Sequence, residues 1–271
     1  MIEYIKDLNP ILLAFIATLF TYSVTAIGAG LVFIFKKVNK NIMDAMLGFA
    51  AGVMIAASYF SLLSPARSMA ENLNMNVTII LFIGFFSGGF FLYIGDKIFN
   101  IFDKKSSKKT NKDNKNNSFK RCLMLITSIT LHNIPEGLAV GVAFGSVIYG
   151  LEGATLSSAF LLALGIGLQN FPEGTAVSVP LRREGMSRKK AFFWGQLSGI
   201  VEPISGVIGA LLVLKIRLLL PFLLSFAAGA MIYVVVQELI PESQTNKKKE
   251  LMALFTLIGF SVMMILDIAL G

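Results

Sequence analysis

Eight long apolar runs make up most of this 271-residue chain, and they constrain its fold more than any other feature. A helix needs about 20 apolar residues to cross a bilayer, and each run approaches or exceeds that length. With 55% hydrophobic and 15% charged residues, the chain is typical of an all-α polytopic membrane protein. The predicted spans lie at 10–35, 43–65, 76–101, 121–148, 154–180, 191–214, 219–241 and 251–270.

The basic residues are divided unevenly between the two sides of such a bundle. When successive spans alternate in direction, 20 of the 24 Lys and Arg residues fall on one side. Cytoplasmic loops carry this excess, so both termini are predicted to lie outside the cytoplasm. The net charge of +8 therefore indicates topology and not nucleic-acid binding. Mixed charges at Glu3, Lys6 and Asp7 argue against a cleaved signal peptide, and the single Cys122 excludes an intramolecular disulfide framework.

The longest polar stretch, 103–120, is rich in Lys and Asn. Such low-complexity composition predicts a disordered cytoplasmic loop. A regulatory metal-binding loop is the alternative, but this stretch has neither the His nor the Cys that such a loop would need. We therefore treat the whole chain as one transmembrane domain with one long internal loop.

One hexapeptide occurs twice, 37 residues apart, in the middle of two consecutive apolar runs. The copies are HNIPEG at 132–137 and QNFPEG at 169–174. A charged side chain at the centre of a membrane costs about 2.5–3.5 kcal/mol on insertion scales, so acidic residues there are usually functional. In a helix, the two polar residues that open each copy lie one turn before its glutamate. The candidate donors are His132, Asn133, Glu136, Gln169, Asn170 and Glu173.

Each copy also contains a proline and ends in a glycine. Pro135 and Pro172 have no N–H group and break the helical hydrogen-bond pattern, so the carbonyl oxygens of Leu131 and Leu168 should be free to bind a ligand. The terminal glycines remove side-chain bulk, so two helices or a metal ion can approach closely.

Together the two motifs offer one imidazole, two carboxylates and three amides. This nitrogen and oxygen set suits Zn²⁺, Fe²⁺, Mn²⁺ or Cd²⁺. The absence of Cys from the motifs argues against Cu⁺, and the histidine argues against Mg²⁺. Plain helix packing and a proton relay without metal are the alternatives.

Acidic residues elsewhere in the apolar runs are further candidates. Glu202 precedes a proline in the sixth run and is expected to join the same site as a third carboxylate. Glu238, with Gln237 beside it in the seventh run, is interpreted as an exit-path or secondary ligand. Asp96 and Asp267 are interpreted as helix-packing or interface charges.

A second internal match links the second run to the seventh. The segment 49–55 (FAAGVMI) recurs as 226–232 (FAAGAMI), at an offset of 177 residues. The charge distribution gives these two runs opposite directions, as it does for the two hexapeptides. Inverted repeats of this kind are frequent in secondary transporters, although small-residue segments also recur by chance in packed membrane helices. At this offset Ser61 corresponds to Glu238, so Ser61 is a further candidate on a transport pathway.

The chain resembles the ZIP (Zrt/Irt-like protein) family of divalent metal transporters. The resemblance is carried by HNIPEG, by NFPEG, by LSGIVEP at 197–203 and by the eight expected spans. Gln before Asn in the second motif is similar to the GufA-like prokaryotic branch. The stretch 103–120 lacks the histidines that many members carry, so metal sensing there is not expected. Gln169 is a weaker ligand than the histidine of many members.

The resemblance implies a 3+2+3 arrangement, in which spans 1–3 and 6–8 are inverted copies around spans 4 and 5. It also implies a two-metal site in which Glu136 and Glu173 bridge the ions. Spans 1, 4, 5 and 6 would move against spans 2, 3, 7 and 8, and homodimers are common. The first metal would also bind His132 and Gln169; the second would bind Asn133, Asn170 and Glu202.

The resulting expectation is an importer of Zn²⁺ and related ions, including Cd²⁺, Fe²⁺ and Mn²⁺, across the cell (inner) membrane into the cytoplasm. The metal would be substrate; no enzymatic activity and no organic cofactor are expected, and no phosphate-binding GxxxxGK[ST] loop is present. The alternatives are a membrane-embedded metal-dependent hydrolase, which usually needs three strong protein ligands, and a proton-coupled solute carrier.

Overall fold

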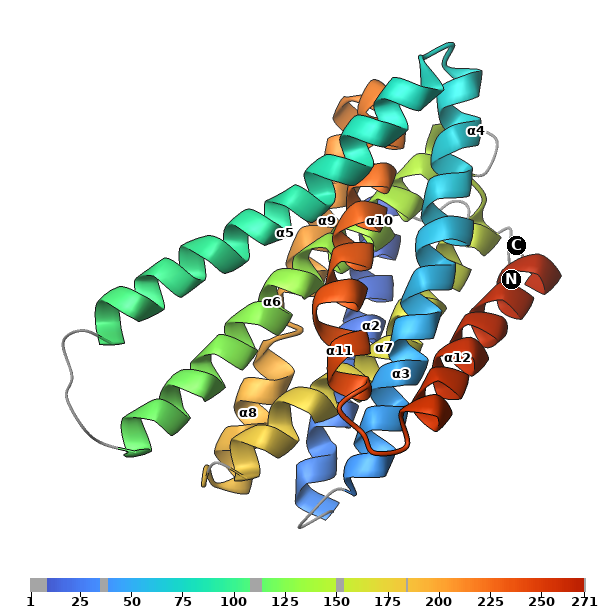
Figure 1. Ribbon diagram of the computed structural model, residues 1–271. Coiled ribbons are helices and arrows are strands. Elements are labelled where there is room, and N and C mark those ends of the chain that lie inside the picture. The colour runs from blue at the N-terminus through green and yellow to red at the C-terminus, as the bar shows by residue number, and fades with distance from the viewer. Residues whose placement is uncertain (1–8, 35–38, 108–113, 150–153, 184, 271) are drawn as a thin grey trace.

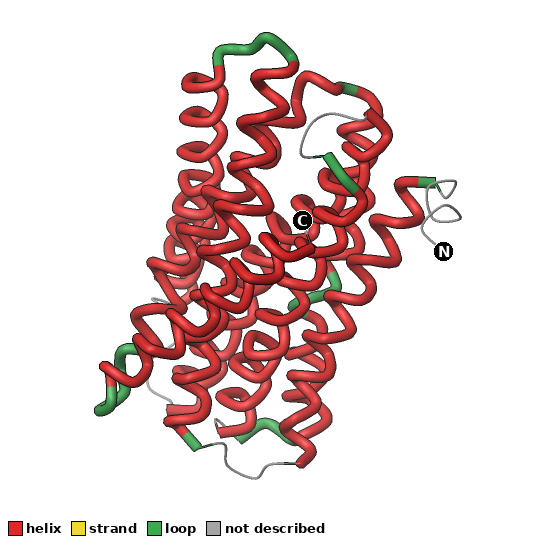
Figure 2. Tube along the Cα trace, turned by 90° about the vertical axis from the view of Figure 1, so that its right-hand side faces the viewer, coloured by secondary structure: helices red, strands yellow, loops and turns green. Residues whose placement is uncertain are grey.

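The computed structural model forms a bundle of long helices, and the described residues contain no strand (Figure 1). Loops are confined mainly to the ends of the helices (Figure 2). This is the architecture that backbone hydrogen bonding requires of a chain with so much apolar surface. The structure describes residues 9–34, 39–107, 114–149, 154–183 and 185–270.

The helices follow one another along the bundle with short connections. In the first half they are α2 (Pro10–Ile34), α3 (Lys40–Ala57), α4 (Ser64–Asn72), α5 (Val77–Ser107) and α6 (Asn114–Ser146). In the second half they are α7 (Leu156–Arg183), α8 (Arg188–Leu197), α9 (Val201–Lys215), α10 (Leu220–Val234), α11 (Ile240–Ser243) and α12 (Lys249–Leu270). Short 3₁₀ turns lie at Val147–Tyr149 (η2) and Arg217–Leu219 (η3).

Six helical segments of the described chain are long and apolar enough to cross a membrane: α2, α3 with α4, α5, α8 with α9, α10 with α11, and α12. This supports a polytopic membrane protein. Helices α6 and α7, which carry the two hexapeptides, are not among the segments found in the described part of the chain. That all eight runs span the membrane stays a prediction.

The polar stretch at 103–120 differs from its prediction. Helix α5 continues to Ser107 and α6 begins at Asn114, so helix extends into both ends of the expected loop. The middle of that loop, 108–113, lies outside the described residues. Lysine is a good helix former, so a helix can continue past its apolar run.

Three helical runs are irregular in the middle. The sixth run, predicted as one helix, is broken at 198–200 between α8 and α9. The second and seventh runs contain π-helical turns at Ser58–Leu63 (η1) and Val235–Leu239 (η4), whose first residues are separated by the same 177 positions as the FAAG match. Helices α6 and α7, in contrast, continue through Pro135 and Pro172, so these prolines, which lack the N–H for a helical hydrogen bond, do not end their helices. Packing against neighbouring helices tolerates proline within a span.

Four glycines lie at close contacts between helices. They form two sets, one in the two hexapeptides and one in the two FAAG segments. A Cβ on Gly137 would overlap α9 at Glu202, and one on Gly174 would overlap α2 at Thr25, which confirms the close approach expected at both hexapeptides. A Cβ on Gly52 of α3 would overlap α12, and one on the equivalent Gly229 of α10 would overlap α5. These four pairs are also the most extensively packed ones: α6 with α9, α2 with α7, α3 with α12, and α5 with α10.

Replacing Gly229 with alanine should destabilise the bundle. The added Cβ would meet the Phe85 backbone, which cannot move as a flexible side chain can. We expect a loss of about 1–3 kcal/mol, measured as a lower melting temperature of the detergent-solubilised protein. Gly30→Ala is the control, because the nearest atom to its Cβ would be a Phe192 side-chain carbon 4.0 Å away. Equal melting temperatures for the two variants would contradict this account.

Candidate metal-binding site

Glu202 is held at the start of α9 by two other helices. The Asn170 amide nitrogen of α7 donates to both carboxylate oxygens, at 3.0 and 2.9 Å. From α2, Thr21 donates to Oε2 and Thr25 donates to Oε1 at 3.4 Å. The break at 198–200 puts Glu202 in the first turn of α9, where the helix dipole favours a negative charge. A fully buried carboxylate is thereby tolerated in an apolar bundle.

A second set of hydrogen bonds joins α6 to α7 and to the helix break. The Gln169 amide nitrogen donates to Glu136 Oε1 at 2.6 Å. The Asn133 amide nitrogen donates to the carbonyl oxygen of Ser198 at 2.9 Å, which satisfies a backbone group in the irregular turn. Both glutamine and asparagine are fully buried, as is Glu136.

Five buried oxygens of these residues have no hydrogen-bond partner. They are Asn133 Oδ1, Glu136 Oε2, Gln169 Oε1, Asn170 Oδ1 and Glu173 Oε2. The amide orientations are fixed because each amide nitrogen already donates to a carbonyl or carboxylate oxygen. Among the described residues, only two other buried side-chain atoms, Ser178 Oγ and Ser225 Oγ, share this condition. Buried polar atoms are normally paired, so a cluster of unpartnered acceptors indicates a site for a cation or donor.

The three glutamates also interact with one another. Glu136 interacts electrostatically with Glu173 and Glu202, so the site brings three carboxyl groups together where little water can screen them from one another. Among the described residues, however, no three His, Cys, Asp or Glu side chains lie close enough together to bind one metal ion by themselves. The donor set therefore depends on amide oxygens together with carboxylates. The His132 side chain lies outside the described residues, so its part in the site stays a prediction.

Comparison with known proteins identifies the family. Residues 103–267 match the family described as ZIP Zinc transporter. The chain is 40% identical to "Zinc transporter ZIP11" of Xenopus tropicalis, over 98% of this chain and 100% of that protein. It is 31% identical to "Zinc transporter GufA" of Myxococcus xanthus, over 94% of this chain and 98% of that protein, and 34% identical to "Zinc transporter ZupT" of Clostridium perfringens, over 97% and 98%.

The chain belongs to the ZIP family. Because this is a family of transporters, the protein is a transporter and not an enzyme, and the hydrolase alternative is set aside. Together with the apolar helices, family membership makes it a multi-pass membrane protein.

The other candidate residues of this ZIP protein carry none of the five unpartnered oxygens. Ser61 in η1 is buried and donates to Asp267 of α12 at 3.1 Å. Gln237 is exposed and Glu238 is half-buried, both in η4, although Glu238 interacts electrostatically with Glu173. Asp96 accepts a hydrogen bond from Tyr233 at 3.1 Å. The bonds made by Asp96 and Asp267 join neighbouring helices, in agreement with their interpretation as helix-packing charges.

Sequence reasoning missed three residues that position the site. Thr21 and Thr25 bond to Glu202, and the carbonyl oxygen of Ser198 accepts from Asn133. The first two belong to a series of threonines that also includes Thr18, at spacings of three and four, which places hydroxyls on one helix face. The sequence signal for the break in the sixth run was Ser198-Gly199 followed by Glu202-Pro203, because glycine and proline commonly interrupt helices.

Replacing Thr21 with valine should weaken metal binding. Valine keeps the shape of the side chain but removes the donor that orients Glu202, and loss of such supporting bonds typically costs about 10–100-fold in affinity. Calorimetric titration of the purified protein with Zn²⁺ would measure this change. Thr18→Val is the control, since Thr18 is equally buried but bonds only within α2. Unchanged affinity in the Thr21 variant would contradict a positioning role.

Proposed function

We propose that this ZIP protein imports Zn²⁺, and related divalent ions such as Cd²⁺, Fe²⁺ and Mn²⁺, across the cell membrane into the cytoplasm. The observation that carries the proposal is the cluster of five unpartnered, buried oxygens in the paired hexapeptides. Oxygen donors with an adjacent imidazole suit borderline divalent cations. Relatives that cover nearly the whole chain are named zinc transporters, which supports zinc as the principal substrate.

Within this proposal, the substrate occupies a two-metal site on α6, α7 and α9. Glu136 and Glu173, the equivalent carboxylates of the two hexapeptides, bridge the two ions, as the family resemblance implies. One ion also uses the Gln169 oxygen and His132. The other uses Asn133, Asn170 and Glu202. The unpartnered amide oxygens of Asn133, Gln169 and Asn170 support their use as donors beside the glutamates.

We further propose eight spans in the 3+2+3 inverted arrangement, with both termini outside the cytoplasm. Two features support it: the helix pairs match under inversion (α3–α12 with α10–α5, and α2–α7 with α9–α6), and the π-helical turns η1 and η4 lie at equivalent positions. In this arrangement α2, α6, α7, α8 and α9 move against α3, α5, α10 and α12 during transport. A homodimer is proposed from family resemblance.

Glu173→Ala should abolish saturable metal uptake. The variant loses a carboxylate with an unpartnered oxygen at the proposed bridging position, so flux should fall at least about tenfold. Uptake of Zn²⁺, Cd²⁺, Mn²⁺, Fe²⁺ and Mg²⁺ into proteoliposomes would measure this. Glu242→Ala is the control, because Glu242 is exposed in α11. Equal flux in both variants would refute the site. Solute transport that survives chelation of all divalent metal would instead favour a proton-coupled solute carrier.

Metal uptake should fall as the pH falls from 7.5 to 5. Protons compete with metal for carboxylate and imidazole ligands, so metal affinity decreases on acidification. The measurement is initial Zn²⁺ uptake in proteoliposomes with the same pH on both sides, which removes any proton gradient. Flux that stays constant over this range would contradict a carboxylate-lined binding site.

A further inference from the structure

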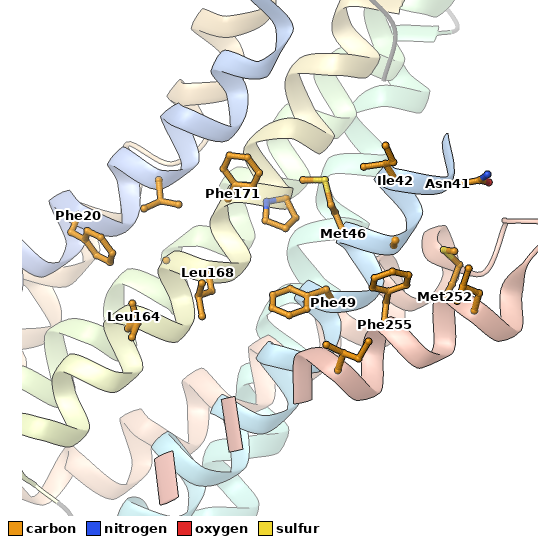
Figure 3. Close-up of a pocket in the computed structure, with 16 residues that line it drawn as sticks. Phe20, Asn41, Ile42, Met46, Phe49, Leu164, Leu168, Phe171, Met252 and Phe255 are labelled. Atoms are coloured by element: carbon orange, nitrogen blue, oxygen red, sulfur yellow. The ribbon is translucent and has the colours of Figure 1, made fainter. Parts of the chain in front are cut away.

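An apolar groove lies on the outside of the bundle, and none of the five unpartnered oxygens lines it. It has a volume of about 800 Å³ and lies between α2 and α7 on one side and α3 and α12 on the other. Its walls include Phe20 and Leu168 opposite Phe49 and Phe255 (Figure 3). Of the sixteen residues that line it, Asn41 alone has a polar side chain. On a membrane-spanning bundle, such a surface contacts the hydrocarbon of the bilayer.

One end of the groove is polar and basic. Asn41 lies at this end, at the opposite end from Phe20 and Leu164 (Figure 3). The Asn246 amide nitrogen donates to Asn41 Oδ1 at 3.0 Å and to Asp44 Oδ2 at 2.7 Å. The Lys248 backbone N–H donates to Asn246 Oδ1 at 2.8 Å. These bonds fix the segment between α11 and α12 against the start of α3.

The fixed segment places several exposed lysines around this end of the groove. Lys40 begins α3, and Lys247, Lys248 and Lys249 precede or begin α12; all four are exposed. Three acidic residues are near in sequence, and one of them, Glu242, is exposed in α11. Asp44 is buried and hydrogen-bonded by Asn246, and Glu250 is exposed. The exposed charge at this end is therefore positive, on the side to which the charge distribution assigns the cytoplasm.

We propose that this groove binds an anionic phospholipid, with an acyl chain along the apolar walls and the phosphate headgroup among these lysines. The charge is complementary, because basic clusters beside a membrane attract the anionic lipids of the cytoplasmic leaflet. The shape is also complementary to a phospholipid, since the polar end of the groove continues into its apolar walls, as a headgroup continues into an acyl chain. The proposal does not depend on which ion the protein transports.

The groove also lies directly behind the candidate metal site. Leu168, Phe171 and Pro172 of α7 line the groove, whereas Gln169, Asn170 and Glu173 of the same turns are buried in the interior. A lipid chain in the groove therefore contacts the opposite face of the helix that carries the metal donors.

Native mass spectrometry of the purified full-length chain tests the proposal, with phosphatidylglycerol and phosphatidylcholine added separately. One lysine near an anionic surface changes affinity about fivefold, so the wild type should retain phosphatidylglycerol at least about fivefold better. The double variant Lys40→Gln/Lys249→Gln should lose this preference. Lys189→Gln/Lys190→Gln should keep it, because this exposed pair begins α8, away from the groove. Equal retention of both lipids by the wild type, or equal effects of the two double variants, would overturn the proposal.

A second variant tests the apolar part of the groove. Ile42 lines the groove and is 56% exposed, so Ile42→Trp should fill space and reduce retention of both lipids. Ile204→Trp is the matched control, since Ile204 of α9 is 58% exposed and does not line the groove. Leu164→Trp, on the opposite wall, replaces the test variant if Ile42→Trp does not fold. Unchanged lipid retention in the folded groove variant would refute the proposal. The proposal would also be refuted if the protein were a dimer and the substitution dissociated it without loss of lipid, because the groove would then be an interface between two copies of the chain.

Discussion

The structure depends on the way in which a buried carboxylate, Glu202, is held in an apolar bundle. Asn170 of α7 and Thr21 of α2 donate hydrogen bonds to it, so three helices meet at one negative charge. An isolated carboxylate would be costly in this environment, whereas one with several donors is tolerated. The same bonds use the nitrogen of Asn170 and leave its oxygen unpartnered. The same set of interactions therefore stabilises the bundle and forms the candidate site.

Close helix contacts make this arrangement possible. Gly137 brings α6 against α9, and Gly174 brings α7 against α2. Between lipid-exposed helices there is little hydrophobic driving force, so packing of small residues supplies much of the association. Because these glycines end the two hexapeptides, each motif supplies both the polar donors and the contact that holds its helix against a neighbour. The matched contacts of Gly52 and Gly229 lie in two further helix pairs, α3 with α12 and α10 with α5.

Helix α7 separates two environments of opposite character. Its interior face carries Gln169, Asn170 and Glu173, and its outer face carries Phe171 and Pro172 along the apolar groove. The helix stays continuous through the proline, so both faces belong to one helix. A ligand on either face contacts the same two turns. The groove also lies between the helix pairs that the proposed transport cycle moves, so its shape would change with the conformation of the protein.

The sequence by itself determined the helical membrane class, the candidate polar residues of the two hexapeptides and the repeat at 177 residues, because apolar runs and helical spacing are local properties. It did not determine that Thr21 and Thr25 hold Glu202, that the sixth run breaks at 198–200, or that α6 and α7 continue through their prolines. Each of these depends on which helices meet and at what rotation. These helix–helix contacts join residues that are far apart in the sequence; the hydrogen bond from Thr21 to Glu202, for example, spans 181 positions. Only the tertiary structure decided these three features, because the hydrogen-bond donors and backbone contacts that stabilise each of them come from distant parts of the chain.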